Sequence, residues 1–68
     1  MTLDDYRQYL GWSWGKLARE ADLDKDTVLR ANRRESIRGD TANRLARAIS
    51  RGLGKTIHFS EIEGLNVQ

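Results

Sequence analysis

The feature of the sequence that most constrains the fold is a pair of short apolar repeats within residues 13–34, interrupted once at residues 22–24. Small or apolar side chains recur on both sides of the interruption at the three- and four-residue spacing of a helix face: Leu17, Ala18, Ala21, Val28 and Ala31. The segment therefore predicts two short helices that share an apolar side and are joined by a tight turn.

Polar residues mark the start of both helices. Ser13 is a good N-cap for the first helix, and Trp12 before it with Leu17 after it form the arrangement of a hydrophobic staple. Asp22 suits the turn because Asp tolerates the left-handed conformation, and Asp24 is expected to cap the second helix through its carboxylate. The two helices are therefore predicted to begin after Ser13 and after Asp24.

Two further helices are predicted on either side of this pair. Thr2 followed by two acidic residues is a strong helix start, and Gly11 ends that helix. The other, over residues 41–51, is the clearest amphipathic helix of the chain, with Asp40 or Thr41 as its cap. The side chains of these two helices expected in or beside the core are Leu3, Tyr6, Tyr9, Leu10, Ala42, Leu45, Ala46 and Ile49. The side chains expected to face away from the core on the second are Asn43, Arg44, Arg47, Ser50 and Arg51.

The C-terminal tail, residues 55–68, is too apolar to be a disordered segment. Residues 56–59 have an extended pattern, and Ser60 is expected to cap a single helical turn that ends at Gly64. The apolar side chains of the tail are Ile57, Phe59, Ile62, Leu65 and Val67. They either close the core of the chain itself, which we favour, or form part of a dimer surface.

Composition excludes several classes of function. The 68 residues contain no cysteine and a single histidine, His58, so neither a disulfide framework nor a metal site is expected. The sequence has no glycine-rich phosphate loop and no nucleophile beside a base, so we expect neither enzyme activity nor a cofactor. No apolar run approaches the roughly 20 residues of a membrane-spanning helix, and the N-terminus is acidic. We therefore expect a single cytoplasmic domain over residues 1–68, stabilised by helix packing.

Basic residues are concentrated in the second half of the chain. Residues 24–55 carry nine basic side chains against four acidic ones, whereas residues 1–23 carry three against four. The positive charge therefore begins where the second short helix begins. It has two interpretations: a solvated arginine-rich surface, or a surface that meets the phosphate backbone of a nucleic acid.

The order of residues in the two short helices is that of a helix-turn-helix. A small residue, Ala18, lies in the first helix, Leu23 is the apolar centre of a three-residue turn, and the β-branched Val28 lies in the middle of the second helix. At these positions the chain resembles the Xre-type regulators, the class of the phage repressors and Cro proteins. The residues that carry the resemblance, which spans roughly residues 3–53, are Leu17, Ala18, Ala21, Leu23, Val28 and the run 45–49. It implies an all-α fold: a compact lambda-repressor-like domain of four to five helices with a short extended segment near the C-terminus.

The chain departs from the family pattern at three positions. Asp22 replaces the usual Gly of the turn, and Trp14 replaces a Gln that often contacts a phosphate. Family members frequently pair an Arg that matches Arg7 with a Glu at the end of the recognition helix, where this chain has Asn32. Trp14 therefore has two interpretations: its ring lies against the sugar-phosphate backbone, or it covers the boundary with the first helix.

The resemblance implies double-stranded DNA as the partner, with the N-terminal end of the helix that begins at Lys25 in the major groove. The side chains expected to contact bases are Lys25, Asp26, Thr27, Leu29 and Arg30. Those expected to contact the DNA backbone are Ser13, Trp14, Lys16, Arg33, Arg34 and Arg38. Binding is expected as a homodimer on a pseudo-palindrome with half-sites about 34 Å apart. A plainer interpretation of Lys25, Asp26 and Arg30 is a charge network within one helix.

These features favour a small transcriptional regulator, a repressor or Cro-like protein of bacterial, phage or mobile-element origin. One alternative is an antitoxin-like interaction module, in which the apolar tail binds a partner protein. Another is an architectural or excision-type factor that shapes DNA. A steep salt dependence of DNA affinity separates the regulator from the interaction module, and DNA bending would identify the architectural factor.

Overall fold

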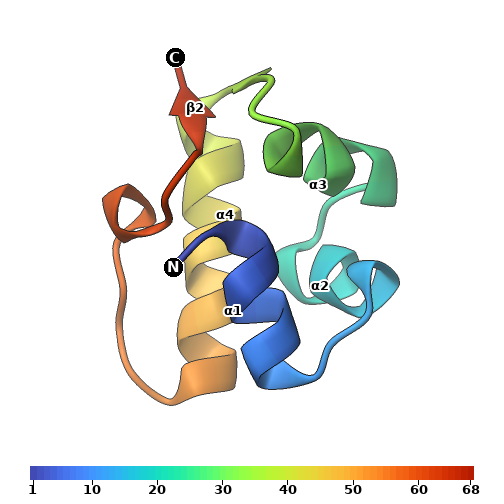
Figure 1. Ribbon diagram of the computed structural model, residues 1–68, viewed down its shortest axis with the longest axis vertical. Helices are drawn as coiled ribbons and strands as arrows, with labels where there is room; N and C mark the ends of the chain where they lie inside the picture. Colours follow the sequence, from blue (N-terminus) through green and yellow to red (C-terminus); the bar gives the residue numbers. More distant parts are fainter.

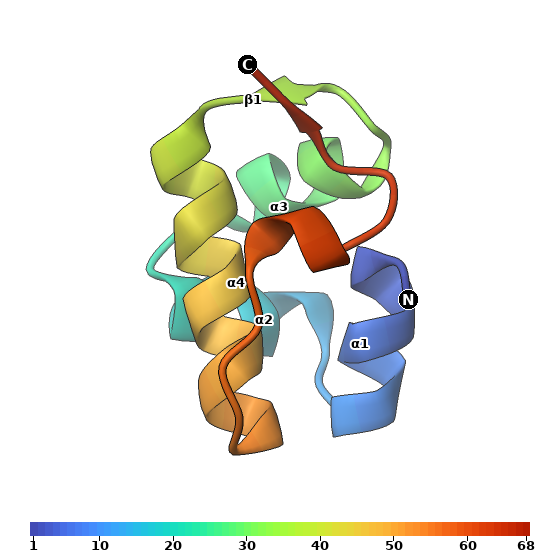
Figure 2. The same cartoon turned by 90° about the vertical axis from the view of Figure 1, so that its left-hand side faces the viewer.

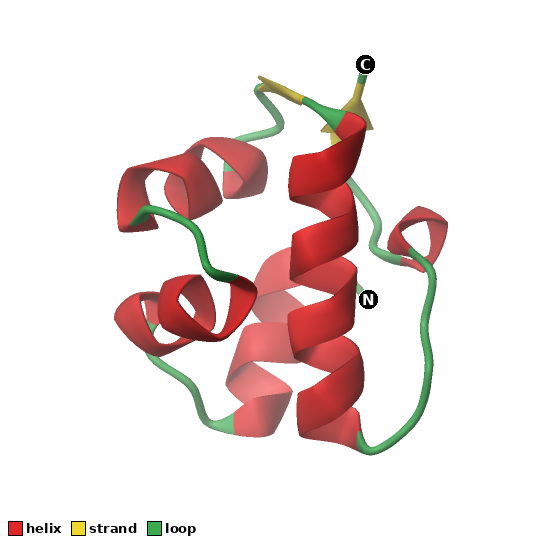
Figure 3. Cartoon of the chain, turned by 180° about the vertical axis from the view of Figure 1, so that it is seen from behind, coloured by secondary structure: helices red, strands yellow, loops and turns green.

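The longest helix, α4, is the element about which the rest of the chain is arranged (Figure 1). The computed structural model describes residues 1–68. In chain order the elements are α1 (Leu3–Leu10), α2 (Trp14–Ala21), α3 (Lys25–Asn32), β1 (Ser36–Ile37), α4 (Gly39–Leu53), the 3-10 helix η1 (Phe59–Glu61) and β2 (Asn66–Val67). Helices α2 and α3 lie to one side of α4 and the C-terminal tail lies to the other (Figures 1 and 3). The predicted, predominantly helical fold is confirmed, with a small two-stranded sheet added to it.

One apolar core of 15 buried residues is shared by the four helices, β1 and the tail. Its largest completely buried side chains are Leu3, Leu17, Val28, Leu45 and Ile49. Tyr6 is buried as predicted, but Tyr9 is 74% exposed, so its predicted packing is wrong. Tyr9 lies beside Leu53 and Lys55 at a position where no further element covers α1.

The first two helices begin at the predicted caps. The Thr2 hydroxyl accepts from the backbone N–H of Asp5 at 3.1 Å, and the Asp5 carboxylate accepts from the backbone N–H of Thr2 at 2.9 Å, which is a complete capping box. That backbone N–H is the main reason why the pKa of Asp5 lies below its usual value of 3.8. At α2 the Ser13 hydroxyl accepts from the backbone N–H of Lys16 at 3.0 Å.

Helix α4 begins earlier than predicted. Its N-cap is Arg38, which has an extended backbone and no side-chain cap, so the predicted caps Asp40 and Thr41 lie inside the first turn. The backbone carbonyl of Arg38 already accepts from the N–H of Ala42 at 3.0 Å. Strand β1 fixes Ile37 immediately before this cap, and the helix therefore starts as soon as the strand ends.

Ser50 was predicted to face away from the core. In the structure its hydroxyl instead joins the tail to α4. Its hydroxyl donates to the carbonyl of Ala46 at 2.7 Å and accepts from the backbone N–H of Ile57 at 2.9 Å. Ile57 and Ile62 are buried in the common core, and Figure 2 shows the tail running along α4 with η1 between α4 and α1.

The tail ends as a strand that pairs in parallel with β1. Ser36 pairs with Asn66 and Ile37 with Val67. Of the predicted extended segment 56–59, His58 has an extended backbone, whereas Phe59 already belongs to η1; the strand near the C-terminus is β2. The single helical turn is η1, and it is capped by His58 and not by the predicted Ser60: Nδ1 of His58 accepts from the backbone N–H of Ser60 at 3.2 Å.

Candidate nucleic-acid interface

The turn between α2 and α3 is formed by the predicted residues, 22–24, and is stabilised by a backbone hydrogen bond. Asp22 has the left-handed conformation, with φ of 56°. The N–H of Leu23 donates to the carbonyl of Ala18 at 2.9 Å, which completes the hydrogen bonding at the C-terminus of α2. Leu23 is partly buried and packs against the core, as an apolar plug should. The turn therefore directs the N-terminus of α3 away from α2 without a glycine.

Asp24 precedes α3 as its N-cap residue, but its predicted capping hydrogen bond is absent. Its backbone is extended, and its carbonyl accepts the first helical hydrogen bond, from Val28, at 3.2 Å. The Asp24 carboxylate is exposed at the edge of the turn instead. The predicted start of the helix is thus correct, whereas the predicted role of the carboxylate is wrong.

Helix α3 buries one side and leaves the other free. Val28 and Ala31 are 0% and 1% exposed, and they hold the helix against the core. Of the five side chains predicted to contact bases, Lys25, Asp26 and Arg30 are exposed and Leu29 and Thr27 are partly buried. Oδ2 of Asp26 lies 3.1 Å from Nε of Arg30, so these two side chains form the predicted pair along the helix.

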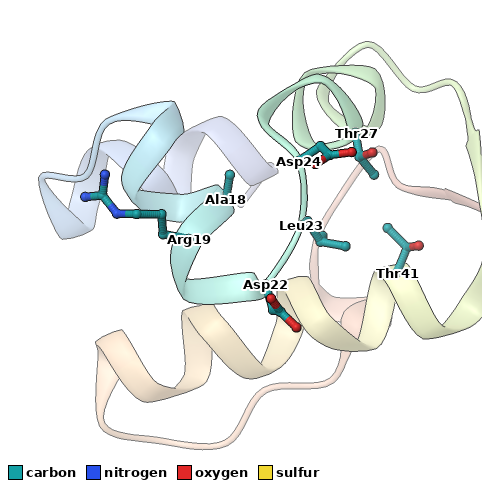
Figure 4. Close-up of a pocket in the computed structure, with 7 residues that line it drawn as sticks. All are labelled: Ala18, Arg19, Asp22, Leu23, Asp24, Thr27 and Thr41. Atoms are coloured by element: carbon teal, nitrogen blue, oxygen red, sulfur yellow. The ribbon is translucent and has the colours of Figure 1, made fainter.

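Thr27 is separated from the other four predicted base contacts. It lines an open depression, about 680 Å³ in volume, at the junction of α2, α3 and α4. Figure 4 shows the lining side chains, which are Ala18, Arg19, Asp22, Leu23, Asp24, Thr27 and Thr41. Only two of the seven are apolar, which is unlike the mostly apolar lining of a small-molecule pocket.

At the N-terminus of α2, Trp14 covers the boundary with α1. The guanidinium carbon of Arg7 lies 4.4 Å from the centroid of the Trp14 ring, in the geometry of a cation–π contact. Arg7 in turn donates to Oδ1 of Asp4 at 2.7 Å and to the carbonyl of Trp12 at 2.8 Å. Arg7 is therefore paired within α1 and not with the end of α3, where Asn32 is exposed.

The other predicted backbone contacts of α2 lie beside Trp14. Ser13 is exposed, and its hydroxyl is used by the cap. The ammonium of Lys16 lies 3.9 Å from the carboxylate of Glu20 and 5.9 Å from the centroid of the Trp12 ring. Ser13, Trp14 and Lys16 are therefore together at one helix end, as predicted.

The three arginines that follow α3 differ in their contacts. Arg33 pairs with Glu35 at 2.9 Å, and Arg38 pairs with Asp40 at 3.6 Å. Arg34 has the left-handed conformation, with φ of 67°, and its side chain lies against the tail, where a Cβ added to Gly64 would come within 3.2 Å of Nε. Two of these three predicted backbone contacts therefore pair with carboxylates close in sequence, and the third lies against the tail.

The comparisons with known proteins add no relative: neither a family model, nor a curated protein, nor a solved structure matches the chain. No group of three or more His, Cys, Asp or Glu side chains is placed so that it could hold a metal ion. None of the helices combines the length and the apolar character that crossing a bilayer requires.

Proposed function

We propose that this chain is a sequence-specific DNA-binding protein that uses α2, the turn and α3 as a helix-turn-helix in a lambda-repressor-like fold. The observation that carries the proposal is the asymmetry of α3. This helix of eight residues buries Val28 and Ala31, yet Lys25, Asp26 and Arg30 remain exposed. These are hydrogen-bonding groups that suit base edges, and Leu29 beside them suits a thymine methyl group.

The position of the tail supports DNA over a protein partner as the ligand. Ile57 and Ile62 are already buried against the chain's own core, and Phe59, Leu65 and Val67 pack against the same core. An antitoxin-like module would need those apolar side chains for its partner. The proposal therefore assigns the tail to stability and α3 to recognition.

The biological role proposed is that of a small transcriptional regulator, repressor or Cro-like, in the cytoplasm of a bacterium or an infected host cell. One short recognition helix reaches few base pairs, so we propose that two copies bind a pseudo-palindrome with half-sites about 34 Å apart. In this arrangement Ser13, Lys16 and Arg33 position each copy on phosphates, while Lys25, Asp26 and Arg30 read the bases.

The proposal is tested by selecting binding sites from random duplex DNA and measuring the affinity of the best site and of a scrambled duplex over a range of salt concentrations. An inverted repeat bound at least about 1000-fold better than the scramble is the expected result. The affinity for both duplexes should fall steeply with salt. Failure to enrich any sequence, together with weak binding that disappears at physiological salt, would refute the proposal.

A further inference from the structure

A second basic surface runs along α4, outside the helix-turn-helix. Arg44, Arg47 and Arg51 follow one another at intervals of three and four residues, so they form one ridge on the exposed side of α4. The ridge is about 10.5 Å long, since seven residues separate its ends. The proposed recognition of DNA by α3 makes no use of it.

Two of the three arginines are fixed in position by α2. Nη1 of Arg44 donates to the carbonyl of Asp22 at 3.0 Å, and Nη2 of Arg51 donates to the carbonyl of Glu20. A carbonyl is uncharged, so it orients the guanidinium without neutralising it. Each guanidinium has five N–H donors, and most of those of Arg44 and Arg51 remain free for another acceptor.

Arg47, in the middle of the ridge, is exposed and forms neither an ion pair nor a side-chain hydrogen bond within the chain. The acidic groups near the ridge are few. The Asp22 carboxylate lies 3.5 Å from Arg44, and Asp40, one turn before Arg44, already pairs with Arg38. The ridge therefore keeps a net positive charge, which Arg47 and Arg51 carry without a carboxylate partner.

The ridge adjoins the proposed recognition surface. Arg44 contacts Asp22, two residues before the N-cap of α3, so the ridge begins beside the turn that leads into the recognition helix. The three guanidinium groups lie along one side of α4, so they are arranged to contact neighbouring phosphates of a duplex bound by α3.

We propose that the ridge of Arg44, Arg47 and Arg51 binds the phosphate backbone of DNA that flanks the site read by α3. This inference rests on the proposed function and extends it: the protein contacts a longer stretch of duplex than α3 alone would. The ridge adds affinity and salt dependence without adding sequence preference, because it contacts phosphates only.

The test compares two duplexes that contain the same selected site, one that ends at the outer edge of each half-site and one that extends about 10 base pairs beyond each edge. The full chain is titrated with each over a range of salt concentrations. For the wild type, the slope of log affinity against log salt should be steeper on the long duplex, by about 0.9 for each added phosphate contact.

Arg47→Ala is the decisive variant, because Arg47 has no contact within the fold to lose. It should reduce the extra slope on the long duplex by about 0.9 per protomer and leave binding to the short duplex unchanged. Arg47→Lys should retain most of the extra slope. Arg19→Ala is the matched control: Arg19 is also exposed, but it belongs to α2 and points away from α4 (Figure 4), so its removal should affect both duplexes alike.

Equal wild-type slopes on the two duplexes would overturn the inference and leave an acidic protein surface as the partner for the ridge. A loss in Arg47→Ala that is the same on both duplexes would also overturn it, because Arg47 would then contact the central site. These results are distinct from failure of the proposed function, in which the wild type would prefer neither duplex over a scramble.

Discussion

The arginines around α3 and those along α4 are all exposed to solvent, but they differ in their partners. Arg30, Arg33 and Arg38 each pair with a carboxylate from a residue close in sequence, Asp26, Glu35 and Asp40 respectively. On α4, in contrast, only Arg44 lies near a carboxylate, that of Asp22, while Arg51 is bound to a carbonyl and Arg47 has no partner. The charges of the first group are paired, whereas the second group keeps a net positive charge.

In the proposed function, this difference separates two tasks that a DNA-binding protein has to perform. Exposed ion pairs stabilise a fold by about 0 to 1 kcal/mol, so the pairs around α3 open at little cost when a base offers a better partner. Until then they limit attraction to arbitrary phosphates. The unneutralised arginines of α4 attract any duplex, which suits flanking contacts and not readout.

The largest effect that would test this comparison is expected from Arg30→Ala. Arg30 is proposed to donate to a guanine, so its loss should cost about 1 to 3 kcal/mol on the selected site and relax the preference at one base pair. Arg33→Ala is the matched variant, since Arg33 is also paired and exposed but is assigned to phosphates. It should weaken the selected and the scrambled duplex alike, with a salt slope lower by about one.

Binding measurements with every substitution of one base pair of the site distinguish the two variants. If Arg30→Ala weakened all duplexes equally, Arg30 would belong to the backbone contacts, and the contrast between readout on α3 and phosphate binding elsewhere would disappear.

The next effect is expected from Asp26→Asn, which removes the carboxylate beside Arg30 and leaves the side-chain size unchanged. The unpaired charge of Arg30 should then strengthen binding to scrambled DNA several-fold and make the salt dependence of that binding steeper by about 0.9. The ratio of specific to nonspecific affinity should therefore fall. Thermal stability should change by less than about 0.5 kcal/mol, because the pair is exposed. An unchanged slope would show that Asp26 does not shield Arg30 from phosphates.

The sequence was sufficient to predict features that depend on local periodicity. The apolar face of α4, the caps at Thr2 and Ser13 and the left-handed Asp22 follow from neighbours within four residues, and all are present. The exposed side of α3 was predictable for the same reason, since burial of Val28 and Ala31 determines which side chains point outward.

Features that depend on contacts between distant residues were not predictable. Nothing in the sequence of the tail indicates that β2 pairs with β1, about 30 residues earlier. Nor does it indicate that the backbone N–H of Ile57 donates to the hydroxyl of Ser50. The helical pattern predicts only that Arg51 faces away from the core, whereas its contact with the carbonyl of Glu20 requires α2 and α4 to be packed together. The position of Arg34 against Gly64 is of the same kind.

Within the ridge itself, Arg51 and Arg47 should differ in their contribution to stability. Arg51→Ala removes a charged donor from a carbonyl near the C-terminus of α2 and should lower the free energy of unfolding by about 0.5 to 1.5 kcal/mol. Arg47→Ala should change it by less than about 0.5 kcal/mol. Thermal denaturation measures both, since about 1 kcal/mol shifts Tm by about 4 to 8 °C in a domain of this size. Equal losses would mean that the contact between Arg51 and Glu20 contributes nothing in solution.

The smallest effect concerns Arg34, which follows α3 but has no carboxylate partner. The left-handed conformation destabilises a residue other than Gly by about 1 to 2 kcal/mol, so replacement by Gly removes this strain. Part of the stabilisation is lost again because Gly loses more chain entropy on folding. Arg34→Gly should therefore raise the free energy of unfolding by about 0.5 to 1 kcal/mol.

Asp22→Gly is the matched control for Arg34→Gly, because Asp22 has the same backbone conformation. Its gain should be smaller, since Asp tolerates this conformation better and the Asp22 carboxylate also faces Arg44. A lower Tm for Arg34→Gly would mean that the packing of Arg34 against the tail outweighs its backbone strain. Arg34 would then serve to fasten the end of α3 to the C-terminal tail, and its role would be structural, unlike the roles proposed for Arg30 and Arg33.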